Sequence, residues 1–256
     1  MTLAALLRLA LVPAAVWLAS LAARRWGHRV SGYLGGMPLI GGPITFFLAL
    51  DHGSAFAARS ATLTLAAIAG QAAHLLVFAY VSRAARWPLA LVSGWASFAL
   101  VSLAAVWIDP APIPAALVAF GSLAAARALL PHEGEAAARP SIPPLEMRLR
   151  LAAALGLAAL ILWSAARFGP VVSGLLLSLP VTGSIMPPFT LSLYGPGAVV
   201  RLVRGFLVGL NGFTAFFVVV ALAAGPLGTL SFAVAIGAAV AAVAVAIRMA
   251  APRRKP

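Results

Sequence analysis

Two apolar segments of membrane-spanning length, each interrupted by glycine and proline, constrain this chain more than any other feature. They cover residues 25–59 and 167–201, and they align without a gap when shifted by 142 residues. Because an internal repeat sets the architecture, we expect two related halves. The copies are identical at Arg25/Arg167, Gly27/Gly169, Val30/Val172, Ser31/Ser173, Gly32/Gly174, Leu34/Leu176, Pro38/Pro180, Gly41/Gly183, Phe47/Phe189, Gly53/Gly195 and Arg59/Arg201.

The composition predicts an integral membrane protein. The chain of 256 residues is 63% hydrophobic and only 9% charged, whereas a soluble domain carries about 25% charged residues. The net charge of +13 does not indicate nucleic-acid binding, because the basic residues flank apolar spans as topology determinants. The absence of cysteine excludes thiol chemistry and Cys-ligated metals. We predict neither a metal nor a cofactor.

A helix needs roughly 20 apolar residues to cross the hydrocarbon core of a bilayer. On that basis the sequence predicts nine spans, separated in the middle by the polar loop 131–147. The first span is taken as retained, since its basic cluster follows the apolar run rather than preceding it. The predicted spans are 3–22, 30–50, 58–81, 87–107, 111–130, 149–166, 171–194, 199–222 and 227–249.

The positive charges predict the orientation. With the N-terminus outside and the C-terminus inside, every basic residue except Arg8, Arg59 and Arg167 is cytoplasmic, which is 15 of the 18. Spans one to four then match spans six to nine, and the unpaired fifth span turns the second copy upside down. We therefore predict an all-α membrane protein of two inverted four-helix repeats: 1–108 as the first, 109–147 as connector helix and loop, and 148–256 as the second.

Spans two and seven are predicted to be broken helices. Proline in a helix interior removes a backbone donor, and the freed carbonyls must be buried in protein or line a cavity. We place the breaks at residues 41–43 and 186–188, near mid-depth. They form a substrate site in one interpretation, and tolerated kinks with close glycine packing in the other.

Polar residues lie in the middle of two other spans. Gln71 and His74 in span three, and Asn211 and Thr214 in span eight, are each three apart and so share a helix face. They either form hydrogen bonds between helices or line a pathway in which His74, with an ordinary pKa of about 6.5, couples protons. The predicted pathway residues are Ser31, Pro38, Gly41, Gly42, Pro43, Thr45, Gln71, His74, Ser173, Pro180, Thr182, Gly183, Ser184, Asn211 and Thr214.

One motif resembles that of a known family. Ser31-Gly32, five residues, Pro38, fourteen residues, Gly53 and then Arg59 are similar to the pattern of GlpM-like small membrane proteins. The resemblance covers residues 25–106 and, more weakly, 167–250. It implies a bacterial inner-membrane protein linked to envelope polysaccharide production, and it transfers no catalytic residue. A fused inverted pair also resembles the drug/metabolite transporter superfamily, although span one lacks the carboxylate of its multidrug branch.

These features predict a secondary transporter or flippase for a small or amphipathic solute, with an anion among the candidates. A pathway without buried acids disfavours cations, which need a counter-charge. The alternative is a non-transporting accessory subunit of an envelope polysaccharide or lipid machine, with partners in envelope biosynthesis. An enzyme is not expected, because neither an acid pair nor a nucleophile–base set is present.

Overall fold

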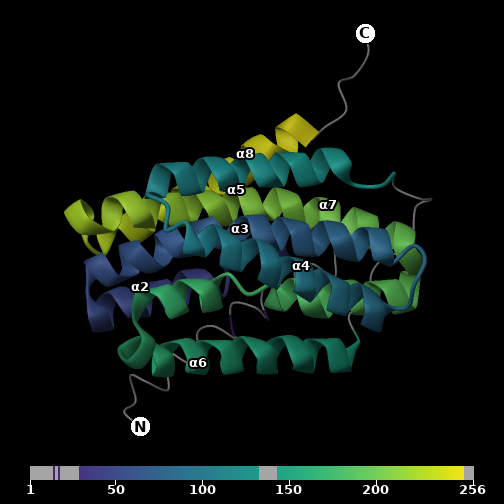
Figure 1. Cartoon of the computed structure of the whole chain (residues 1–256), viewed down its shortest axis with the longest axis horizontal. Helices are drawn as coiled ribbons and strands as arrows, with labels where there is room; N and C mark the ends of the chain where they lie inside the picture. Colours follow the sequence, from purple (N-terminus) through teal and green to yellow (C-terminus); the bar gives the residue numbers. More distant parts are fainter. Residues whose placement is uncertain (1–13, 15–16, 18–28, 133–142, 251–256) are drawn as a thin grey trace.

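In the computed structural model, residues 14, 17, 29–132 and 143–250 can be described, and this part of the chain consists of helices joined by short turns, with no strand. A short helix at 29–35 comes first, and the remaining helices follow in the order shown in Figure 1. They are α2 (Gly41–His52), α3 (Ser54–Val81), α4 (Trp87–Trp107), α5 (Pro112–Leu129), α6 (Pro144–Leu177), α7 (Val181–Leu227) and α8 (Leu230–Ala250).

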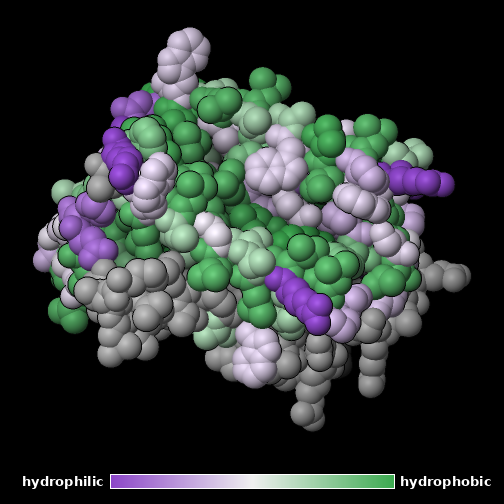
Figure 2. All heavy atoms as spheres, turned by 90° about the horizontal axis from the view of Figure 1, so that it is seen from below, coloured by the Kyte–Doolittle hydropathy of each residue, from purple (hydrophilic) through white to green (hydrophobic). Residues whose placement is uncertain are grey.

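The prediction of a multi-pass membrane protein fits the helices. Five described segments are long and apolar enough to cross a bilayer: Ser54–Val81, Trp87–Trp107, Pro112–Leu129, Arg167–Leu227 and Leu230–Met249. α3 is central and mostly buried, whereas α4, α5 and α8 keep most of their apolar residues on the outside. The face drawn in Figure 2 is mainly hydrophobic, with only scattered hydrophilic side chains. The predicted first span lies almost wholly outside the described residues.

The predicted spans 30–50 and 171–194 are each divided into two short helices, but the divisions lie elsewhere than predicted. The first break covers residues 36–40, and the second covers residues 178–180. The prediction of breaks at 41–43 and 186–188 is therefore wrong. Pro43 is the third residue of α2, where a backbone N–H has no helical partner to lose. Pro187 and Pro188 lie inside α7, which continues through them.

The two breaks have the same backbone hydrogen bonds. In the first, Met37 N donates to Leu34 O at 3.2 Å and Leu39 N to Met37 O at 2.8 Å. In the second, Leu179 N donates to Leu176 O at 3.2 Å and Val181 N to Leu179 O at 2.8 Å. Each residue of the second set follows its counterpart by 142 positions. The corresponding sequences therefore form corresponding local structures.

Glycines at equivalent positions mark the next turn in each copy. Gly53 joins α2 to α3 with φ 87° and ψ 166°, and Gly195 bends α7 with φ 77° and ψ 179°. This region of backbone space is essentially restricted to glycine. The α2–α3 junction lies at the left end of the bundle in Figure 1, whereas α7 bends at the right end. α7 thus consists of two helices, the second of which packs along α3.

The short helices pack in a reciprocal way. Gly32, before the first break, lies directly against the α7 backbone at Leu202 and Phe206. Gly174, before the second break, lies against the α3 backbone at the equivalent residues Ser60 and Thr64. A Cβ atom at either glycine would collide with that backbone, as in the close helix crossings that small residues permit in membranes. Each half of the chain therefore inserts its short helix against the long helix of the other half.

Candidate functional site

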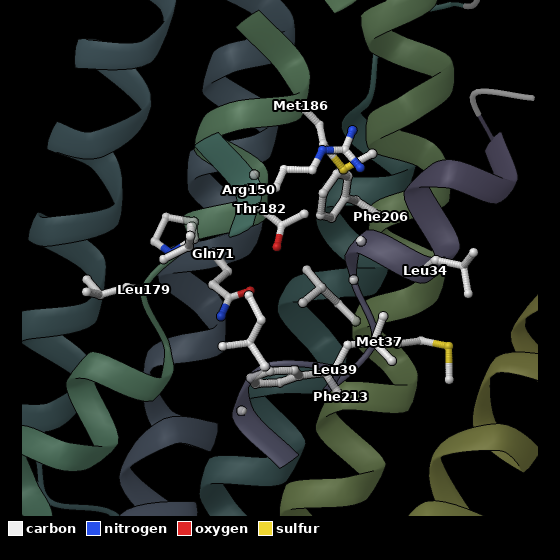
Figure 3. A pocket seen from close by; sticks show the side chains of 18 of the residues that line it. Leu34, Met37, Leu39, Gln71, Arg150, Leu179, Thr182, Met186, Phe206 and Phe213 are labelled. Carbon is white, nitrogen blue, oxygen red and sulfur yellow. The ribbon is translucent and has the colours of Figure 1, made fainter. Parts of the chain in front are cut away.

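A cavity of about 70 Å³ lies between the two breaks. Residues of the first break form one side of it, and residues around the second break form the other (Figure 3). α2 and α7 both begin at this cavity, since Gly41 and Val181 are among its lining residues. Most of the remaining wall is apolar, with contributions from Leu34, Met37, Leu39, Met186, Phe206 and Phe213.

Four polar side chains line the cavity. Ser31, Gln71 and Thr182 belong to the predicted pathway, and Arg150 does not. Arg150 lies in the second turn of α6 and is only 6% exposed. Its Nη2 atom forms an ion pair with Glu146, one helical turn earlier and 5% exposed. The charge pattern predicts Arg150 as a topology determinant, whereas the structure places it in the cavity wall.

Gln71 and His74 bind the two ends of the second break. Gln71 Nε2 donates to the carbonyl of Ser178 at 2.7 Å. His74 Nε2 lies 3.3 Å from the carbonyl oxygen of Gly183, to which the tautomer with a hydrogen on Nε2 donates. The His74 ring is fully buried and packs edge-on against Trp95 with centroids 6.1 Å apart. These contacts join helices, as the simpler interpretation of the pair predicts. Proton coupling by His74 stays a prediction.

The second predicted polar pair does not reach the cavity. Asn211 Nδ2 donates to Leu207 O at 2.7 Å, and Thr214 Oγ1 donates to Leu210 O at 2.8 Å, both within α7. Three other predicted lining hydroxyls behave likewise, each donating to the carbonyl four residues earlier. They are Thr45 (to Gly41), Ser173 (to Gly169) and Ser184 (to Pro180).

Only some of the predicted pathway residues line the cavity. Its lining includes the six residues Ser31, Gly41, Gln71, Pro180, Thr182 and Gly183. Outside the lining are Pro38, Gly42, Pro43, Thr45, His74, Ser173, Ser184, Asn211 and Thr214. Except for Pro38, which lies in the first break, these residues belong to the helices on either side of a break or to the long helices.

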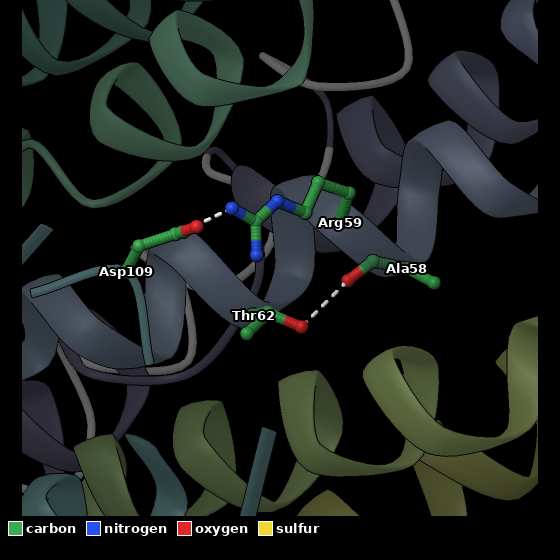
Figure 4. A network of polar contacts seen from close by, with 4 residues as sticks. All are labelled: Ala58, Arg59, Thr62 and Asp109. Carbon is green, nitrogen blue, oxygen red and sulfur yellow. Dashed lines mark hydrogen bonds and ion pairs between the residues drawn. The ribbon is translucent and has the colours of Figure 1, made fainter. Parts of the chain in front are cut away.

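Arg59, one of the repeated arginines, lies away from the cavity. It forms an ion pair with Asp109, in the turn between α4 and α5, while Thr62 donates to the Ala58 carbonyl nearby at 3.0 Å (Figure 4). Both charged side chains are partly exposed, at 38% and 60%. Exposed pairs of this kind contribute about 1 kcal/mol or less. Arg59 therefore connects two helix ends rather than contributing to the cavity.

Within the described residues, no group of three or more histidine or acidic side chains is arranged to hold a metal ion. Comparison of the chain with protein-family models, with curated proteins and with solved structures finds no match. The geometry of the cavity is therefore the basis for any functional assignment.

Proposed function

We propose that this protein is a secondary transporter or flippase that moves a small or amphipathic solute through the cavity between its two broken helices. The observation that carries the proposal is the position of the cavity, which both breaks enclose. Interrupted helices that meet at a central site are a recurrent design of secondary transporters. On the resemblance of its motif, the protein belongs to a bacterial inner membrane.

In this proposal, the solute crosses the membrane because one copy of an inverted repeat moves relative to the other. The matched hydrogen bonds at the breaks, the equivalent bends at Gly53 and Gly195, and the reciprocal packing of Gly32 and Gly174 all support two copies related by a 142-residue shift. Copies that run in opposite directions across the bilayer can exchange conformations. Rocking one against the other opens the shared cavity first to one side and then to the other.

Cysteine labelling tests alternating access without knowledge of the solute. The chain has no native cysteine, so Thr182→Cys places a single thiol in the cavity wall. We expect a membrane-impermeant maleimide to label it in both right-side-out and inverted vesicles, because the cavity opens to each side in turn. Thr214→Cys is the matched control, since Thr214 is fully buried and outside the lining; it should not be labelled from either side.

Labelling of Thr182→Cys from one side only, or from neither, would contradict the proposal. That result would favour the accessory-subunit alternative, which has no need of a site that both aqueous phases reach.

A further inference from the structure

The charge of the cavity wall is positive. Among the described residues that line it, Arg150 is the one charged side chain, and none carries a carboxylate. The first residues of α2 and α7 add to this field, because the N-terminal ends of helices carry partial positive charge. A cation would find no counter-charge in this wall. An anion would find a buried guanidinium, the Gln71 amide and the Thr182 hydroxyl.

The size and polarity of the cavity limit the rest of the ligand. A volume of about 70 Å³ holds roughly five to seven water-sized groups, at about 10–15 Å³ each. Figure 3 shows Arg150 near Thr182, Met186 and Phe206, while Leu39 and Phe213 lie at the opposite end. The matching ligand has one negatively charged head group and a short apolar tail.

Glu146 is the negative partner that such a head group would have to replace. It is buried beside Arg150 and forms an ion pair with the guanidinium from the same helix. A buried guanidinium is costly without a negative partner, so a carboxylate has to remain near it whenever the cavity lacks a ligand. Glu146 does this without being part of the cavity wall.

We propose, on the basis of the transport function proposed above, that the cavity binds a small amphipathic monoanion whose head group replaces Glu146 as the partner of Arg150. Glu146 then acts as the resident counter-ion and competes with the ligand. Arg150 then faces the Glu146 carboxylate in the empty state and the ligand head group in the bound state.

Binding of butyrate to the purified full-length protein tests this inference. Butyrate is compared with butyramide, which has the same shape without charge, with butylamine, which has the opposite charge, and with inorganic phosphate, which has no tail. Titration calorimetry in detergent should detect butyrate and give at least tenfold weaker binding for each of the other three. Equal binding of butyramide or butylamine overturns the charge assignment, and equal binding of phosphate overturns the amphipathic one.

Three variants identify the residues involved. Arg150→Gln should weaken butyrate binding roughly 10- to 150-fold, as expected for loss of a hydrogen bond to a charged group. Arg148→Gln is the matched control, because it removes the same charge from an exposed position two residues away, and it should leave binding unchanged. Glu146→Gln should tighten binding several-fold by removing the competitor.

A double variant keeps the test valid if Arg150→Gln alone does not fold. Glu146→Gln with Arg150→Gln removes both members of the buried ion pair, so it should fold and bind butyrate no better than Arg150→Gln. Wild-type binding in the double variant, or weaker binding in Glu146→Gln, overturns the inference. Labelling of Thr182→Cys from both sides together with absent butyrate binding would reject this ligand class alone and leave the transport proposal standing.

Discussion

At the scale of single residues, the proline-containing second break explains the positions of Gln71 and His74. Pro187 has no N–H, so the carbonyl of Gly183, four residues earlier, lacks its helical donor. His74 lies next to that carbonyl and supplies the missing hydrogen bond. Ser178 is the C-cap residue just after α6, where a carbonyl also has no helical partner, and Gln71 donates to it. Two side chains three residues apart on α3 therefore satisfy the carbonyls on both sides of one break.

Replacement of His74 tests this structural role. His74→Leu removes the side chain that contacts the Gly183 carbonyl, and we expect it to lower the free energy of unfolding by about 1 kcal/mol, the usual range for hydrogen bonds between membrane helices. Thr214→Val is the control, because Thr214 is equally buried but donates to a carbonyl of its own helix. Its effect should be clearly smaller. Thermal unfolding in detergent measures both.

His74→Gln separates the structural role from proton coupling. Glutamine keeps an N–H donor and should retain most of the stability that leucine loses. Under the proton-coupling prediction, the same variant abolishes the pH dependence of transport in proteoliposomes while the protein still folds. An unchanged pH dependence would leave His74 with its structural role only.

At the scale of elements, the sequence predicts the helices well and their breaks less well. The spans 58–81, 87–107 and 111–130 agree with α3, α4 and α5 to within a few residues, because long apolar runs bounded by Arg and Pro have clear ends. The breaks were assigned to the correct spans but to the wrong residues. Several prolines compete within each span, and tertiary contacts such as that of His74 decide which of them a helix tolerates.

The site was predictable only in part for a related reason. Glycine, proline and mid-span polar residues identify the segments around the cavity, since these residue types are unusual within an apolar run. Arg150 has no such signal, because an arginine at the end of a span is ordinarily a topology determinant. Its spacing of four from Glu146 was the only indication that it is paired. Arg150 is buried because of the way α6 packs in the bundle. The sequence pattern does not predict that packing.

Alanine substitutions at Gly53 and Gly195 test whether the backbone conformation of the two bends requires glycine. Beyond the neighbouring residues in the chain, no atom of the described residues lies within 4 Å of the position that a Cβ would take at either glycine, so alanine would meet no steric clash from packing there. It would still be forced into a glycine-only conformation, at a cost of about 1–3 kcal/mol. We expect Gly53→Ala and Gly195→Ala to lower the unfolding temperature by similar amounts.

Gly237→Ala is the matched control for both bends. Gly237 also has open space around it, but it lies within α8 and does not have a positive φ. Because alanine favours the helix interior over glycine, this variant should be neutral or stabilising. If Gly53→Ala and Gly195→Ala behave like Gly237→Ala, the two bends are not conformationally restricted.

At the scale of the whole molecule, the exchange of short helices connects the two halves. The helix at 29–35 packs on the second part of α7, and residues 170–177 pack on α3, so neither half completes its own core. The cavity lies between the breaks that follow these two helices. A movement of one half relative to the other must therefore displace both breaks together, which couples the two ends of the cavity.

The inverted arrangement makes one prediction that involves the whole chain. Ser54 and Pro196 begin α3 and the second part of α7 at equivalent positions, and the adjoining bends lie at opposite ends of the bundle (Figure 1). Single-cysteine variants Ser54→Cys and Pro196→Cys should therefore react with a membrane-impermeant maleimide from opposite sides of the membrane, with Ser54→Cys labelled from outside. Labelling of both from the same side would mean that the copies are parallel. The two halves could not then exchange roles across the bilayer, and alternating access would need a different mechanical basis.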